Sequence, residues 1–122
     1  MSYALGVDLG TTYTAAAVRL NGHAEIARLG SRRAEIPSLV FVRPDGGVLI
    51  GEAAERRGSS EPFRLAREFK RRIGDPVPLL VGGSPYPAHA LMARLLEEVL
   101  GTVTRQQEGQ PALERQLPKN QW

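Results

Sequence analysis

The pattern of apolar and polar positions predicts β-structure through the first half of the chain. Short apolar or β-branched runs alternate with glycine, proline, asparagine and aspartate, which is typical of strands joined by tight turns. The expected strands are residues 3–8, 13–20, 23–29, 36–42 and 48–51. Asn21-Gly22 is a type I′ hairpin signal, so the first three strands should form an antiparallel meander.

The second half shows apolar residues at spacings of three and four, which predict helices. A short helix is expected over residues 52–57, a second over 63–73 and the longest over 87–100, with an apolar strand over 77–81. The apolar stripe of the second helix would consist of Phe63, Ala66, Phe69 and Ile73.

The residues after Gly101 are mostly polar and have no convincing period. We therefore expect a folded part over residues 1–101 and a poorly ordered polar tail over 102–122.

Composition narrows the class of protein. A chain of 122 residues with 42% apolar residues can form one small domain, and the absence of cysteine excludes disulfides and thiolate metal sites. No apolar run approaches the ~20 residues that span a bilayer, so we expect a cytoplasmic protein with no membrane partner. The formal charge of +3, with basic and acidic residues interleaved, argues against a nucleic-acid partner.

The most informative stretch is Gly6-Val7-Asp8-Leu9-Gly10-Thr11-Thr12-Tyr13-Thr14. It reads as a strand that ends on Asp8, a turn with one glycine and two hydroxyl residues, and a second strand. Gly10 lets a ligand approach the backbone, and successive N–H groups of such a turn can bind phosphate. Asp8 would then hold a hydrated Mg²⁺ that screens the phosphates. The alternative is an ordinary hairpin turn, since aspartate, glycine and threonine are common turn residues.

This hairpin resembles the first phosphate-binding hairpin of the actin-like ATPase superfamily, which includes actin, sugar kinases and the DnaK-type heat-shock chaperones. Three later segments resemble the DnaK-type chaperones in the family's order: residues 36–54, 69–74 and 87–100. The resemblance covers residues 3 to 101. It implies an α/β fold, the first lobe of an actin-like ATPase (ribonuclease H-like) domain, incomplete, with a mixed β-sheet and flanking helices.

The resemblance also implies site residues. Asp8 matches the aspartate that holds Mg²⁺ through water, and Gly10, Thr11, Thr12 and Tyr13 match the loop that wraps the phosphates of ATP or ADP. Two positions match catalytic residues. Thr11 matches a residue near the γ-phosphate, and Lys70 matches the lysine that places the attacking water.

The sequence departs from the family pattern at Ile36, where threonine is usual, and at Phe69, a bulky residue directly before Lys70. Without the resemblance, Lys70 would be one solvated basic residue among five on a helix face. Those five are Arg64, Arg67, Lys70, Arg71 and Arg72.

The function implied is that of the ATP-binding portion of a DnaK-like chaperone ATPase, truncated before the second lobe and the peptide-binding domain. Complete members of the family act on unfolded peptides with co-chaperones, whereas the isolated chain should have little or no activity. One alternative is a non-enzymatic remnant or binding module with little nucleotide affinity. Another is a sugar-kinase-like phosphotransferase, although residues 69–74 do not resemble those kinases.

The helix expected over residues 87–100 is apolar and has no evident partner surface in the sequence. We therefore expect Leu91, Leu95 and Leu96 to be partly exposed, and the chain to self-associate through this helix.

Overall fold

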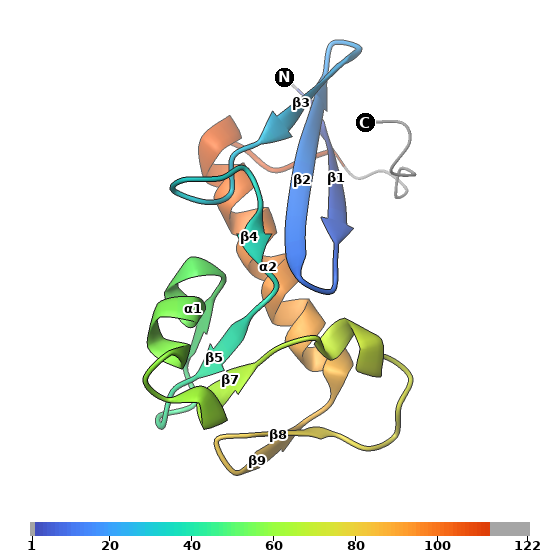
Figure 1. Ribbon diagram of the computed structural model, residues 1–122. Coiled ribbons are helices and arrows are strands. Elements are labelled where there is room, and N and C mark those ends of the chain that lie inside the picture. Colours follow the sequence, from blue (N-terminus) through green and yellow to red (C-terminus); the bar gives the residue numbers. More distant parts are fainter. Residues whose placement is uncertain (1, 113–122) are drawn as a thin grey trace.

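A computed structural model describes residues 2–112 of the chain. The first part is an antiparallel meander to which a short fourth strand is added (Figure 1). Its strands are β1 (Ala4–Leu9), β2 (Tyr13–Leu20), β3 (His23–Ala27) and β4 (Ile36–Pro37). Asn21 and Gly22 have φ of 54° and 79°, as a type I′ turn requires, which confirms the hairpin between β2 and β3.

The second part contains two further small sheets and a short helix. Strand β5 (Val40–Val42) lies between β6 (Val48–Ile50) and β7 (Leu65–Ala66), while β8 (Leu79–Val81) and β9 (Ser84–Tyr86) form a separate hairpin. Helix α1 (Glu52–Gly58) packs against β5 and β6. The α/β class is confirmed, and every strand pair within residues 2–112 is antiparallel.

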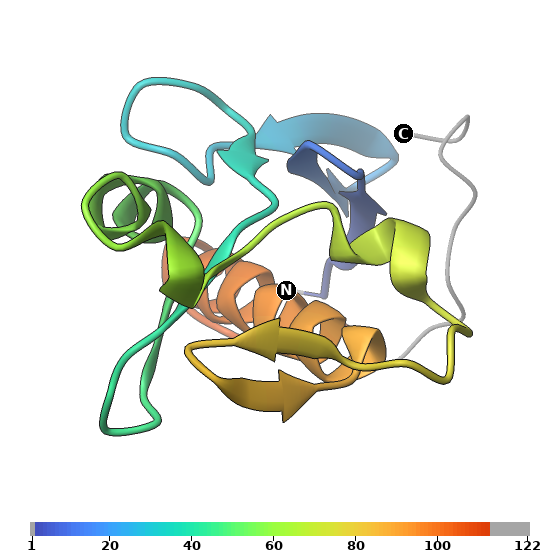
Figure 2. The ribbon, with the colours of Figure 1, turned by 60° about the horizontal axis from the view of Figure 1, so that its bottom comes forward.

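Helix α2 (Ala88–Gln107) runs behind both parts and joins them through one hydrophobic core (Figures 1 and 2). Its buried stripe follows spacings of three and four, as an amphipathic helix requires. The stripe consists of Ala88, Leu91, Leu95, Val99 and Val103.

This burial corrects the expectation of self-association through residues 87–100. Leu91 and Leu95 are 2% and 0% exposed because the chain's own sheets cover them, and only Leu96 is substantially exposed. The apolar face of the helix therefore already has its partner surface within the described chain.

The expected tail is also partly wrong. Residues 102–107 continue α2, and Val103 is fully buried. The chain after the helix is held to the start of β1, since the Tyr3 hydroxyl donates to the Gly109 carbonyl at 2.6 Å and the Ala112 N–H donates to the Tyr3 carbonyl at 2.8 Å. The rest of the predicted tail, residues 113–122, lies outside the described residues.

The helix expected over residues 63–73 does not form. This segment is a 3₁₀ turn η1 (Pro62–Arg64), strand β7 and a second 3₁₀ turn η2 (Phe69–Arg72). Strand β5 is fully buried and recruits Leu65 and Ala66 as a second antiparallel neighbour, which extends the backbone in the middle of the segment. Phe63 is consequently 60% exposed, so the predicted apolar stripe is broken.

Within residues 2–112, no helix combines the length and the apolar character that crossing a bilayer would require.

Candidate functional site

The turn between β1 and β2 is tight and depends on glycine. The Gly10 N–H donates to the Asp8 carbonyl at 3.1 Å, which draws the chain back on itself immediately after the strand. A Cβ atom added to Gly10 would overlap the Tyr13 carbonyl oxygen, a backbone atom at the start of β2. A side chain at this position is therefore incompatible with the turn as it stands.

A buried pair of hydroxyl groups supports this turn from inside. Thr14 is 0% and Ser38 3% exposed, and their hydroxyl oxygens lie 2.8 Å apart. The Ser38 hydroxyl donates to the Gly10 carbonyl at 2.7 Å, so its one proton is used and Thr14 must be the donor between the two hydroxyls. The Ser38 backbone N–H also donates to the Thr12 carbonyl at 2.8 Å.

Neither Thr14 nor Ser38 was predicted as a site residue. The available signal was a hydroxyl residue in each of two otherwise apolar strand segments, a position where a buried oxygen must find a partner.

A cavity of about 300 Å³ opens beside the turn. Its lining includes Thr11, Thr12 and Tyr13 of the turn, together with residues from the link between β4 and β5, from the end of α1 and from the segment after β7. The remaining lining residues are Pro37, Ser38, Leu39, Glu55, Gly58, Ser59, Leu65, Arg67 and Glu68. The predicted turn residues thus face a hollow that also carries charged groups.

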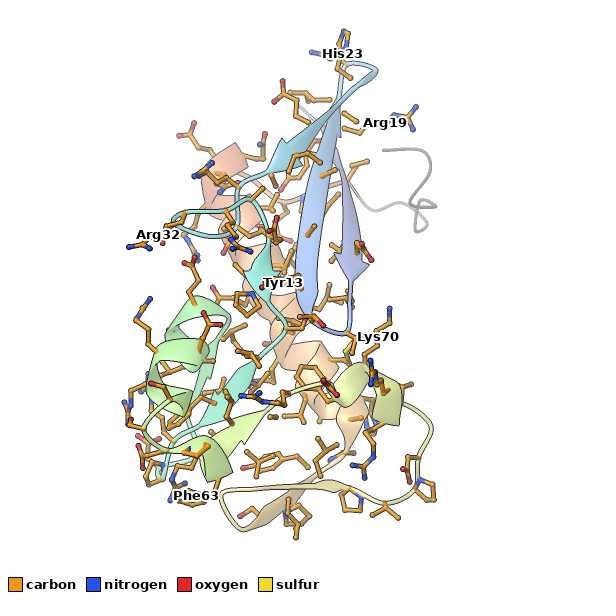
Figure 3. All side chains as sticks on the ribbon, in the orientation of Figure 1. Tyr13, Arg19, His23, Arg32, Phe63 and Lys70 are labelled. Carbon is orange, nitrogen blue, oxygen red and sulfur yellow. The ribbon has the colours of Figure 1, made fainter. Side chains whose placement is uncertain are left out.

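Lys70 reaches the same region from a distant part of the sequence. Glu68 has φ of 55° and ψ of 25°, a left-handed conformation that bends the chain directly before η2. The bend buries Phe69, which is 1% exposed, and leaves Lys70 exposed. Figure 2 shows η2 beside the β1–β2 turn, and in Figure 3 the Lys70 side chain extends toward that turn. Phe69, the departure from the family pattern, thus anchors η2 in the core.

The basic residues around Lys70 do not form one solvated helix face. Arg64 pairs with Glu61 at 3.7 Å, Arg71 with Glu68 at 3.6 Å and Arg72 with Asp75 at 3.1 Å. Within residues 2–112, Arg67 and Lys70 form no ion pair. Arg67 lines the cavity beside the turn. Of the five basic residues between positions 64 and 72, the two without an ion pair in the described part of the chain are thus Arg67 at the cavity and Lys70 on η2.

Asp8 stands in β1 opposite Ala15, two residues before Gly10. The described residues contain no cluster of three or more histidine, aspartate or glutamate side chains that could cage a metal ion. Mg²⁺ is usually held by one or two carboxylates, several waters and the substrate phosphates, and it does not need such a cage. The single carboxylate of Asp8, at the end of the strand that leads into the turn, fits this mode.

A second acidic residue organises the loop that borders Tyr13. The Ser31 N–H donates to both carboxylate oxygens of Glu52, at 3.0 and 3.2 Å. This backbone hydrogen bond is the main cause that lowers the pKa of Glu52 below its usual value. The loop also places the Arg33 guanidinium 5.8 Å from the centre of the Tyr13 ring. Glu52 therefore holds the loop against the start of α1.

The chain is similar in sequence to known proteins. The family model described as Hsp70 protein matches residues 4–79, more than half of the chain. Chaperone protein DnaK of Elusimicrobium minutum (strain Pei191) is 33% identical over 105 residues, 81% of this chain and 17% of that protein. Chaperone protein DnaK of Cenarchaeum symbiosum (strain A) is 31% identical over 105 residues, 81% of this chain and 16% of that protein.

Heat shock 70 kDa protein BIP3 of Oryza sativa subsp. japonica is 41% identical over 70 residues, 57% of this chain and 10% of that protein. The chain thus spans between 10% and 17% of the length of these relatives. On the extent of the family match, the chain belongs to the Hsp70 family.

Proposed function

We propose that this chain supplies the phosphate-binding wall of a Mg·ATP site of the Hsp70 type. The observation that carries the proposal is the juxtaposition of the glycine turn with Lys70, two elements from distant parts of the sequence. Phosphoryl transfer depends on positioning and on positive charge near the phosphates. Aligned backbone N–H groups and one amine would supply both.

Each site residue has a role in this proposal. The N–H groups of the turn from Gly10 to Tyr13 bind the β- and γ-phosphates, with the Thr11 hydroxyl near the γ-phosphate. The Lys70 ammonium orients the attacking water and stabilises the charge that develops on the γ-phosphoryl group. Asp8 holds the hydration shell of Mg²⁺, which when bound neutralises charge on the phosphates.

In the whole proteins of this family, we propose that ATP hydrolysis at this site drives a chaperone cycle with unfolded peptides and co-chaperones as partners. The chain spans at most 17% of the length of the relatives compared above, so a second candidate function is a non-enzymatic binding module with little nucleotide affinity. Nucleotide binding by the purified chain distinguishes the two.

The test is thermal unfolding of the chain with and without Mg·ATP. A ligand that binds only the folded state at 100 times its Kd raises the free energy of unfolding by about 2.7 kcal/mol, or the Tm by roughly 10 °C. Asp8→Asn should make the shift independent of Mg²⁺. Lys70→Met should leave the melt without ligand unchanged, because the side chain is exposed, and should reduce the shift.

Arg19→Met is the matched control. Arg19 is also an exposed cation, but Figure 3 shows it toward the opposite end of the β1–β2 hairpin from Lys70. This variant should retain the full response to Mg·ATP. A cooperative melt that ignores millimolar Mg·ATP would refute nucleotide binding and support the binding module.

A further inference from the structure

Ser38 makes two hydrogen bonds to the turn, and each fixes a different peptide group. Its hydroxyl donates to the Gly10 carbonyl at 2.7 Å, and its backbone N–H donates to the Thr12 carbonyl at 2.8 Å. Ser38 is buried, so both carbonyls are drawn toward the interior.

Because each peptide group is rigid, these two contacts also fix the direction of the N–H groups that share a peptide with the two carbonyls. A trans peptide is planar, so its C=O and N–H point in opposite directions. The Gly10 carbonyl shares its peptide group with the Thr11 N–H, and the Thr12 carbonyl shares its group with the Tyr13 N–H. Fixing the carbonyls inward aims these two N–H groups away from Ser38.

We infer that Ser38, backed by Thr14, is a positioning residue that presents the Thr11 N–H to a bound phosphate. The inference rests on the proposed function, because the ligand is the polyphosphate of ATP. Ser38 acts through the turn and contacts no phosphate itself.

Thr14 has the supporting role. Its hydroxyl donates to the Ser38 oxygen at 2.8 Å and so leaves the Ser38 proton to point at Gly10. Both hydroxyls are almost fully buried, and solvent therefore does not replace either partner. Loss of the Thr14 hydroxyl should loosen the turn less than loss of the Ser38 hydroxyl, because the bond to Gly10 survives.

The informative variants are Ser38→Ala, Ser38→Thr and Thr14→Val. Ser38→Ala removes the donor to Gly10 but keeps the backbone bond to Thr12, whereas Ser38→Thr keeps the hydroxyl. Ser59→Ala is the matched control, because Ser59 lines the same cavity but its hydroxyl donates to the Arg56 carbonyl at 2.8 Å.

Two measurements on the full chain separate the inference from the proposed function. The first is the ¹⁵N order parameter of the Thr11 N–H without ligand, which should fall from about 0.85 to below about 0.6 in Ser38→Ala. The second is the Kd for Mg·ATP, which should rise about tenfold in Ser38→Ala. Slow amide exchange in β2 and β3 shows that each variant remains folded, and Ser38→Thr should restore both values.

An unchanged Thr11 order parameter in Ser38→Ala would overturn the inference, whatever the Kd for Mg·ATP is. A loosened Thr11 with an unchanged Kd would also overturn it, because the turn would then not need Ser38 to bind phosphate. If the wild-type chain ignores Mg·ATP while Ser38→Ala still loosens Thr11, the proposed function fails and the hold of Ser38 on the peptide group stands.

Discussion

Replacement of Gly10 by alanine tests the tightness of the turn directly. The new Cβ would overlap the Tyr13 carbonyl oxygen, and the obstacle is backbone, so no side chain can rotate away. Tyr13 begins β2 and is paired with Pro37 of β4, which restricts movement on that side. The turn must therefore open at Gly10 itself, where the carbonyl accepts the Ser38 hydroxyl.

These contacts set the size of the expected loss of stability. Forcing an additional methyl group into a well-packed position costs about 1–3 kcal/mol, and loss of a buried hydrogen bond adds about 1 kcal/mol. We expect Gly10→Ala to lower the free energy of unfolding by about 3 kcal/mol. For a domain of this size the Tm should fall by roughly 10 °C.

The assay is thermal unfolding followed by far-UV circular dichroism, with Gly101→Ala as the control. Gly101 lies inside α2, where an added Cβ would meet only the Arg105 Nη1 atom at an ordinary 3.5 Å. Alanine is preferred over glycine in a helix by about 1 kcal/mol. The same substitution should thus raise the Tm at residue 101 and lower it at residue 10, and a Gly10→Ala variant that melts with the wild type would refute the structural reasoning.

Two further predictions concern the core and the response to acid. Leu95→Ala should lower the free energy of unfolding by about 2–5 kcal/mol because Leu95 is fully buried, whereas Leu96→Ala on the same helix should lower it by less than about 1 kcal/mol. Similar denaturant midpoints for the two variants would contradict the orientation of α2. The lowered pKa of Glu52 means that its carboxylate stabilises the fold above the unfolded pKa and that this contribution is lost as the pH falls through the folded pKa. Acidification below pH 4.5 should therefore lower the protection factor of the Ser31 amide, its exchange rate relative to an unstructured peptide at the same pH, in the wild type. Glu52→Gln should show no such dependence on pH.

Local turn chemistry was enough to predict the framework of the site. The type I′ signal at Asn21-Gly22 and the glycine turn after Asp8 depend only on neighbouring residues, so β2 was predicted with its observed bounds. The prediction of a helix over residues 63–73 was wrong because a tertiary contact determines the conformation of this segment. Apolar residues at spacings of three and four predicted a helix, but pairing with the buried strand β5 extends Leu65 and Ala66.

The hydrogen bonds that support the turn could not be predicted from the sequence either, because they too depend on a tertiary contact. Thr14 and Ser38 are 24 positions apart and meet only because β4 pairs with the start of β2 in one register. A shift of that register by one residue would turn the Ser38 side chain to the other face of the sheet. The hydroxyl pair therefore depends on a tertiary pairing that residue types alone do not specify. The turn residues can be predicted from the sequence, whereas the contacts that aim their N–H groups require the fold.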